Sequence, residues 1–176
     1  MLSGLWRLVD FTFAAMNTLT KPIKRSKYLV PLSREHHDGL LFSWKIHRGL
    51  AMGINIERIT RYCSWFYETH LKHHFRKEEY GLSKILSIDD PMMVRMLTDH
   101  EAIKMKLNML NEIATAPRLE HFAQFFGRHI RFEEREMFNY IENIATTDQL
   151  KELFCDLNTT SCARKEWSDE FWISSN

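Results

Sequence analysis

Apolar residues recur along most of the chain every three or four positions, the spacing that places them on one face of an α-helix. The pattern predicts long helices over residues 34–53, 56–81, 91–110 and 117–141, followed by a shorter helix at about 148–157. No alternating run of β-branched residues predicts a strand, and only 6 glycines and 4 prolines are available to interrupt helices. Four amphipathic helices with short connections predict an all-α fold, an antiparallel up-down four-helix bundle with a short extra C-terminal helix.

Residues with known preferences for helix termini mark the expected boundaries. Asn55 offers a side chain that can cap the second helix. Pro91 after Asp90 favours a helix start, because proline at the first helical position gives up no intrahelical hydrogen bond. The other expected start signals are Ser33, Pro117 and Thr147.

The helical region divides the chain into three parts. Residues 1–32 are predicted to form an N-terminal extension and linker, residues 33–160 the helical bundle, and residues 161–176 a C-terminal tail. The apolar stretch 1–15 contains Arg7 and Asp10 and is shorter than the roughly 20 apolar residues of a membrane-spanning helix. We therefore expect a short appended helix or leader there, a basic linker at 21–31, and no membrane association.

Charge and cysteine content narrow the classes of partner. Lys and Arg total 24 against 23 Asp and Glu, so the net charge of +1 predicts neither a nucleic-acid partner nor binding to an acidic membrane. The 3 cysteines, Cys63, Cys155 and Cys162, show no Cys-x-x-Cys spacing, which favours reduced thiols in a cytoplasmic protein. Nothing in the pattern fixes the oligomeric state.

Two similar segments place a histidine four residues before a glutamate. Residues 74–79 read HFRKEE, and residues 129–134 read HIRFEE. Residues four apart share one helix face, so the pairs His74–Glu78 and His129–Glu133 continue the apolar stripes into the bundle interior. An unpaired buried carboxylate costs several kcal/mol, so two of them facing each other require a proton or a cation between them.

Two further histidines extend this interior set. His100 takes an apolar position in the stripe of the third predicted helix. The first predicted helix begins with the adjacent pair His36 and His37, of which His37 lines up with the apolar positions 40, 41 and 44. We therefore assign His37 to the interior and His36 to another face, in line with His47.

Four imidazoles and two carboxylates from four helices form a donor set for two metal ions. Nitrogen and oxygen donors without a thiolate favour iron, with manganese as the alternative, over a structural zinc site. In this interpretation Glu78 and Glu133 bridge the two ions, and each histidine supplies one nitrogen. The predicted ligands are His37, His74, Glu78, His100, His129 and Glu133.

The neighbouring acidic and histidine residues are assigned other roles. Glu79 and Glu134 fall off the interior stripes and are expected to be solvated charges. His70 lies one turn before His74 and is expected to support the site or to pack, without binding metal. The histidines expected at the surface or its boundary are His47, His73 and His121.

The order and spacing of these motifs resemble the hemerythrin-like HHE cation-binding domains. The matching segments are SREHHDGLL (33–41), HLKHHFRKEE (70–79), TDHEAIKMKL (98–107) and HIRFEEREMF (129–138). The resemblance implies a left-handed four-helix bundle around a non-haem di-iron centre, with the same six side chains as its ligands.

Two differences distinguish the chain from the oxygen-carrying members of that family. Lys104 stands four residues after His100, where the carriers have a second histidine. The carriers also end with an HxxxxD motif, whereas here Glu133 and Glu134 follow the last histidine at four and five residues. We expect Lys104 to lie on the side of its helix that faces the metal ions and to leave coordination positions open. Its ammonium is expected to pair with a carboxylate, to turn toward the bundle end, or to have a lowered pKa through desolvation and like charge. The set is closer to those of the iron-centre repair proteins and of the iron-sensing members.

These features predict a protein that senses or handles O2, NO or iron through an open di-iron centre, with a diatomic ligand or peroxide as its partner. The alternative is a di-iron redox enzyme that acts on peroxide or nitric oxide, or in iron-centre repair. The repair proteins of the family carry a cysteine-bearing N-terminal region. This chain has no cysteine before Cys63, which argues against repair.

Overall fold

The computed structural model describes residues 25–159 and 166–173, and most of these residues are helical, with no strand among them. The predicted all-α composition is therefore confirmed. Residues 1–15 and Cys162, for which the sequence suggested a leader and a reduced thiol, lie outside the described residues. The elements, with η marking a π-helix, are α2 (Val30–Ala51), α3 (Ile56–Phe66), η1 (Tyr67–Leu71), α4 (Lys72–Leu82), α5 (Pro91–Glu112), α6 (Ala116–Phe132), η2 (Glu133–Met137), α7 (Phe138–Ile144) and α8 (Thr147–Thr159).

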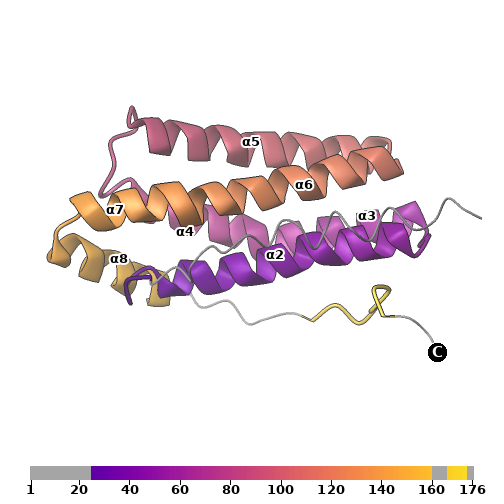
Figure 1. Cartoon of the computed structure of the whole chain (residues 1–176), viewed down its shortest axis with the longest axis horizontal. Helices are drawn as coiled ribbons and strands as arrows, with labels where there is room; N and C mark the ends of the chain where they lie inside the picture. Colours follow the sequence, from indigo (N-terminus) through magenta and orange to yellow (C-terminus); the bar gives the residue numbers. More distant parts are fainter. Residues whose placement is uncertain (1–24, 160–165, 174–176) are drawn as a thin grey trace, which may run out of the picture.

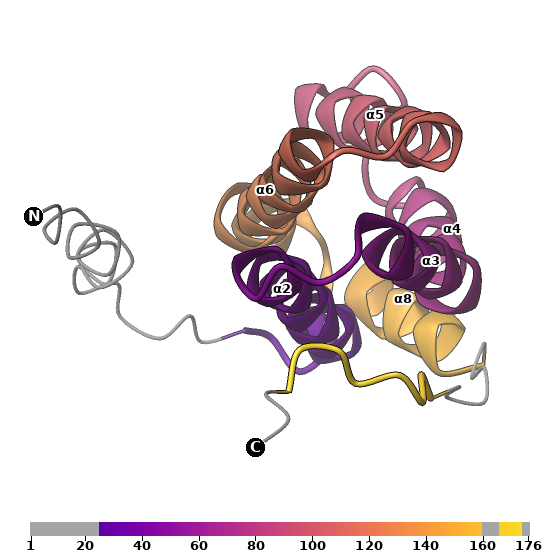
Figure 2. The same cartoon turned by 90° about the vertical axis from the view of Figure 1, so that its right-hand side faces the viewer.

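The long helices lie lengthwise beside one another (Figure 1), and the end-on view shows them grouped around a common interior (Figure 2). Helix α2 packs against α6, and α6 packs against α5. Helices α3 and α4 each contact both α2 and α5, while α8 lies against α4 and α2. The arrangement is that of a helical bundle, in which the helices between residues 30 and 159 surround one interior.

The side chains at several helix starts act as the sequence predicts. The Asn55 side chain accepts a hydrogen bond from the backbone N–H of Arg58 at 3.2 Å, which caps α3. The Asp90 carboxylate accepts from the backbone N–H of Met92 at 2.8 Å and caps α5. These caps satisfy N–H groups that have no partner within their own helix.

Two other start signals are displaced in the structure. Helix α2 begins at Val30 instead of after Ser33, because Pro31 occupies its first turn, where proline is tolerated. The cap of α8 is Thr146 rather than Thr147, since the Thr146 hydroxyl accepts from the Gln149 N–H at 3.2 Å. Both shifts are small and leave the order of the elements unchanged.

Two π-helical segments interrupt helices that the sequence pattern predicts to be continuous. Segment η1 ends three residues before His74, and η2 begins at Glu133. A π turn contains an extra residue compared with an α turn, so it changes the direction of the side chains that follow. Such segments occur frequently at functional sites.

The apolar core consists of two clusters with polar side chains between them. One cluster contains Phe42, Phe66 and Phe75, and the other contains Leu82 and Phe138. The Phe75 ring stacks on His100 with centroids 3.8 Å apart, and the Phe138 ring stacks on His36 at 5.2 Å. The buried polar residues that include these two histidines therefore form a layer that touches both clusters.

Both ends of the described chain pack onto the bundle. Leu29, within the predicted linker at 21–31, is fully buried just before α2 and belongs to one of the core clusters. At the other end, the Phe171 and Trp172 rings each lie 5.4 Å from the Tyr62 ring, measured between centroids. The aromatic tail thus covers α3.

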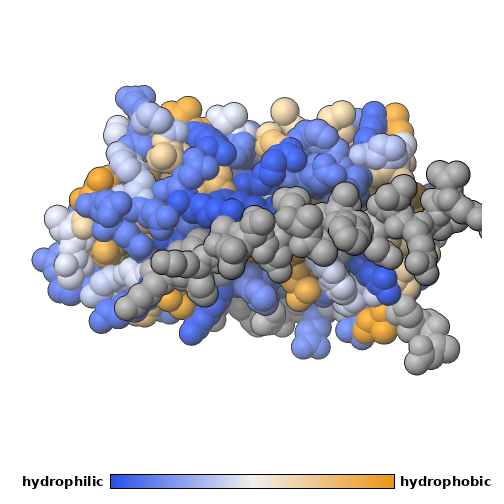
Figure 3. All heavy atoms as spheres, in the orientation of Figure 1, coloured by the Kyte–Doolittle hydropathy of each residue, from blue (hydrophilic) through white to orange (hydrophobic). Residues whose placement is uncertain are grey.

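The visible outer face is largely hydrophilic, with scattered apolar residues (Figure 3). Among the exposed apolar side chains are Met105, Met109 and Ile113 on or just after α5. Within the described ranges, none of the helices combines the length and the apolar character needed to cross a bilayer.

Phe42 and Leu41 provide a test of which face of α2 is buried. Phe42 is 0% exposed and stacks on Phe66 with centroids 4.1 Å apart, whereas Leu41 is 41% exposed. We expect Phe42→Ala to lower the free energy of unfolding by about 3–5 kcal/mol because it leaves a cavity. Leu41→Ala should cost less than about 1 kcal/mol. Chemical denaturation of both variants measures the difference, and equal losses would contradict this orientation of α2.

Candidate metal centre

Six buried polar side chains meet in the layer between the two apolar clusters. Each long helix contributes to this group, so the site exists only when the bundle is assembled. The exposed fractions of these side chains lie between 0% and 7%, which makes the group one of the most enclosed parts of the described chain. Its members are His36 from α2, His74 and Glu78 from α4, His100 from α5, His129 from α6 and Glu133 from η2.

The Nε2 atoms of His36 and His74 point at the two carboxylates. His36 Nε2 lies 3.1 Å from Glu78 Oε1 and 3.1 Å from Glu133 Oε2. His74 Nε2 lies 3.2 Å from Glu78 Oε2, one helical turn along α4. One side of the carboxylate pair therefore faces two imidazole nitrogens.

The other side of the carboxylate pair faces His100 and His129. His129 Nε2 lies 3.2 Å from Glu133 Oε1, across one turn from α6 into η2. His100 Nε2 lies 3.4 Å from Glu78 Oε2 and 3.7 Å from Glu133 Oε1. The two halves of the site thus have the same composition, and both use Glu78 and Glu133.

The donor atoms form two compact groups, in each of which all atoms lie within 4.8 Å of one another. The first group is His36, His74, Glu78 and Glu133, and the second is Glu78, His100, His129 and Glu133. Two cation positions that share both glutamates fit this arrangement.

Several buried polar atoms of the site have no hydrogen-bond partner, which also favours a cation at this position. Both oxygens of Glu133, Oε2 of Glu78 and Nε2 of His100 and His129 are buried and have no hydrogen-bond partner among the described residues. A buried polar group without a partner costs about 1–3 kcal/mol, and more when it is charged. Metal coordination would satisfy these atoms together, because all of them face the same interior.

The mutual contacts shift the pKa values of the buried groups. Burial lowers the pKa of His36, but the close carboxylates of Glu133, Glu134 and Glu78 outweigh burial and raise it well above its usual range. The pKa of Glu78 moves the other way: burial raises it, and the close imidazoles of His74, His100 and His36 bring it well below its usual range. Without metal, the carboxylates therefore favour the charged form of His36, and the imidazoles favour the ionised form of Glu78.

A second ring of carboxylates holds the outer nitrogens of the histidines. His36 Nδ1 lies 2.7 Å from Glu134 Oε1, and His74 Nδ1 lies 2.8 Å from Glu35 Oε2. When Nδ1–H donates to such a carboxylate, the lone pair of Nε2 is left facing the interior, which is the tautomer that binds metal.

The contact recurs for one imidazole on the other half of the site. His100 Nδ1 lies 2.9 Å from Glu79 Oε1, whereas His129 Nδ1 lies 3.5 Å from Asp99 Oδ2 and has no hydrogen-bond partner among the described residues. Glu79 and Glu134 are therefore not the solvated charges that the helical stripes predicted. The signal in the sequence was the doubled glutamate at 78–79 and 133–134, in which the first residue faces the interior and the second faces a histidine of another helix.

The structure places five of the six residues assigned to the interior in the site, and it corrects the sixth. His37 is exposed, and His36 occupies the position assigned to it. His37 was assigned to the interior because it lines up with apolar residues, but two of these, Leu41 and Trp44, are 41% and 44% exposed and do not mark the buried face. The buried face of α2 instead runs through positions 36, 39, 42, 43 and 46 and includes glycine and serine.

Lys104 and His70 take positions outside the donor group. The Lys104 side chain is 31% exposed, with Nζ 2.7 Å from Glu101 Oε1 and 3.9 Å from Glu79 Oε1. Its ammonium therefore pairs with carboxylates, which was one of the expected alternatives, and does not face the interior. Its pKa is raised, chiefly by the hydrogen bond to Glu101, and not lowered. His70 stacks on Phe66 with centroids 4.7 Å apart and packs without belonging to either donor group, in agreement with the packing role predicted for it.

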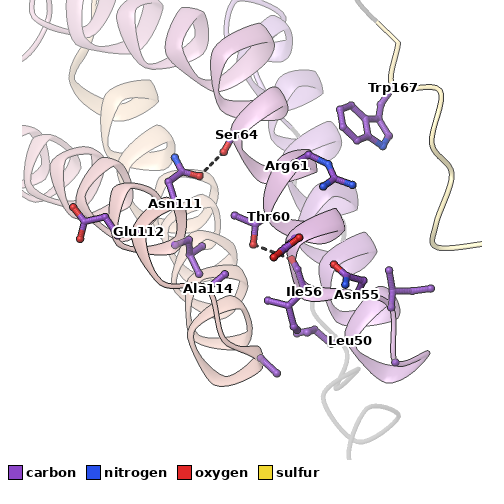
Figure 4. A pocket seen from close by; sticks show the side chains of 15 residues that line it. Leu50, Asn55, Ile56, Thr60, Arg61, Ser64, Asn111, Glu112, Ala114 and Trp167 are labelled. Atoms are coloured by element: carbon purple, nitrogen blue, oxygen red, sulfur yellow. Dashed lines mark hydrogen bonds between the residues drawn. The ribbon is translucent and has the colours of Figure 1, made fainter.

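A large cleft of about 1180 Å³ lies elsewhere, at the end of the bundle where α3 begins and α5 ends (Figure 4). Ser64 Oγ donates to Asn111 Oδ1 at 2.7 Å between its walls, and Trp167 lies at its edge. None of the six central donors lines this cleft. The cleft and the donor group are therefore separate features.

Comparisons with known proteins place the same region of the chain in a family. Residues 32–141 match the model of the hemerythrin HHE cation binding domain, and this match covers more than half of the chain. The matched residues include all six central donors. Searches of curated proteins and of solved structures gave no match.

The two adjacent histidines of α2 allow a matched test of the site. His36→Gln should leave one cation position with a single imidazole, so we expect metal content after dialysis to fall from two ions per chain toward one. His37→Gln should bind as the unmodified protein does, because His37 is exposed. Elemental analysis of the two variants measures this difference. Loss of metal in His37→Gln alone would show that α2 is turned differently.

Proposed function

Because the chain belongs to the hemerythrin HHE cation-binding family, we propose that its six central side chains bind two non-haem iron ions inside an antiparallel four-helix bundle. The observation that carries this proposal is the pair of buried donor groups that share Glu78 and Glu133. Two separate mononuclear sites would not need shared carboxylates, whereas a dinuclear centre does.

The residues would divide between the two ions by position. His36 and His74 would bind one ion, His100 and His129 would bind the other, and the two glutamates would bridge them. Two divalent ions would supply the positive charge that the buried carboxylates require. The Nδ1 contacts of His36, His74 and His100 would hold these imidazoles in the tautomer that ligation requires.

The type of donor favours iron, with manganese as the alternative. Imidazole and carboxylate ligands suit both metals, and none of the six central donors is a thiolate. When bound, such a pair of ions supplies redox chemistry and open positions for a small ligand. Four imidazole nitrogens and four carboxylate oxygens do not fill the roughly twelve positions of two octahedral ions.

The enclosure of the site limits what it can act on. The residues that carry the donors are at most 7% exposed, and none of them lines the large cleft, so the described residues leave little surface at which a bulky substrate could reach the donors. We therefore propose that the protein senses or handles O2, NO or peroxide. A redox enzyme with one of these small substrates is the alternative, and multiple turnover in a stopped-flow or electrode assay distinguishes it from a binding protein.

Removal of either shared glutamate should affect both ions. We expect about two irons per chain in protein from iron-supplemented medium, and loss of both in Glu78→Ala and Glu133→Ala, because each carboxylate belongs to both donor groups. Elemental analysis and the visible spectrum of the oxidised protein measure this loss.

Two sets of controls accompany this experiment. Glu79→Gln and Glu134→Gln should retain the ions with about 10–100-fold weaker affinity, the usual cost of losing an outer partner of a ligand. Glu57→Ala, on the exposed start of α3, should change nothing. Stoichiometric zinc, or no metal after iron loading, would contradict the proposed function.

Metal binding should be linked to proton release. Burial lowers the pKa values of His36 and His100, but their carboxylate partners raise them by more, so both imidazoles hold their protons more strongly than usual without metal. Binding must displace these protons, and affinity should therefore fall as pH falls. Calorimetric titration with Co2+ in two buffers of different ionisation enthalpy measures the released protons. Identical heats in both buffers would mean that no proton leaves.

A further inference from the structure

Arg25 lies before the first described helix, yet its side chain is only 5% exposed. Its guanidinium contacts residues that lie 109 and 114 positions later in the sequence, in η2 and α7. Arg25 Nη2 lies 3.0 Å from Glu134 Oε2 and also donates to the Glu134 backbone carbonyl, while Nη1 donates to Asn139 Oδ1 at 3.1 Å. A buried arginine is stable only when its charge is paired in this way. These contacts therefore fix the position of residues 25–29, which precede α2.

The Glu134 carboxylate connects Arg25 to the candidate metal centre. One oxygen, Oε2, faces Arg25, and the other oxygen, Oε1, faces Nδ1 of His36 at 2.7 Å. With one oxygen held by the guanidinium, the carboxylate is oriented so that the second oxygen meets the imidazole. Arg25 therefore acts on His36 through one intermediate side chain.

Phe138 provides a second connection between the same two residues. The Arg25 guanidinium lies over the Phe138 ring at 5.2 Å, and the His36 ring stacks on Phe138 at 5.2 Å with an interplanar angle of 11°. The neighbouring Ser26 N–H donates to Glu142 Oε1 at 2.7 Å, which extends the attachment along the chain. Displacement of this segment would disturb the packing of His36 as well as its hydrogen bond.

Two other imidazoles have outer carboxylates that also pair with cations. Lys77 Nζ lies 2.5 Å from the carboxylate of Glu35, and Lys104 Nζ lies 3.9 Å from that of Glu79. Those lysines belong to α4 and α5, which already carry ligands of the site. Arg25 differs because it belongs to a segment that precedes the bundle, so its docking can change without unfolding a helix.

We infer that Arg25 is a positioning residue for His36, and that docking of residues 25–28 is coupled to metal binding at the His36 position. The inference rests on the proposed metal-binding function. Coupling of this kind is reciprocal: if the docked segment strengthens metal binding by some factor, bound metal strengthens docking by the same factor. The segment before α2 would thereby respond to occupancy of the centre.

The first arm of the test measures affinity for Co2+ by competition with a chelator. Arg25→Gln should weaken the binding of one of the two ions by about 10–100-fold and leave the other unchanged, and Arg25→Lys should lie between. The matched control is Arg95→Gln. Arg95 also pairs with a glutamate of η2, with Nη1 3.1 Å from Glu136 Oε2, and lies 3.7 Å above the Phe132 ring, but Glu136 touches none of the donors.

The second arm measures hydrogen exchange in a peptide that covers residues 25–29, with and without Co2+. Bound Co2+ should slow exchange there in the unmodified protein and should slow it less in Glu134→Gln. This arm needs no change at Arg25 and remains decisive if Arg25→Gln does not fold.

Equal affinities of the unmodified protein and Arg25→Gln for both ions would overturn the inference while leaving the proposed function intact. Exchange at 25–29 that Co2+ does not change would do the same. An unmodified protein that binds no Co2+ or iron would overturn the proposed function, and the inference would fall with it.

Discussion

The structure depends on holding two ionised carboxylates, Glu78 and Glu133, next to each other inside a helical core. Both side chains are 0% exposed, so water does not offset their repulsion. Four imidazoles surround them, and carboxylates in turn contact the outer nitrogens of three of those imidazoles. Acidic and basic groups therefore alternate outward from the centre to cations such as Arg25 and Lys77. Each layer of ionisable groups is stable inside the core only because the groups of the next layer pair with it.

Much of this arrangement could be predicted from the sequence, because it is unusual for a histidine and a glutamate to share the apolar face of a helix. The four-residue spacing of His74 with Glu78, and of His129 with Glu133, places each pair on one helix face whatever the details of packing. Helical periodicity also predicted every long helix, and the caps Asn55 and Asp90 fixed two of their starts. The strongest predictions came from positions where polar residues interrupt an apolar stripe.

Other parts depend on tertiary packing and could not be predicted in this way. His36 and His37 are adjacent, and the apolar residues beside them include Trp44, which is 44% exposed, while the serine and glycine of the same helix are buried. Small residues allow close helix packing, but they leave no mark in a hydrophobic pattern. The outer carboxylates Glu79 and Glu134 were missed for another reason: their histidine partners come from different helices, and only the folded chain brings them together.

The π segments have a consequence for how this chain can change its length. Successive helical residues differ by about 100° in direction, so the extra residue in η2 turns everything from Phe138 onward relative to His129. Deleting one residue there would leave a regular helix, but it would rotate Phe138 and Ile141 out of the core cluster that they share. The same reasoning applies to η1. Insertions and deletions are therefore compatible with the fold only in the connections between helices, while within these two helices the number of residues is as constrained as their identity.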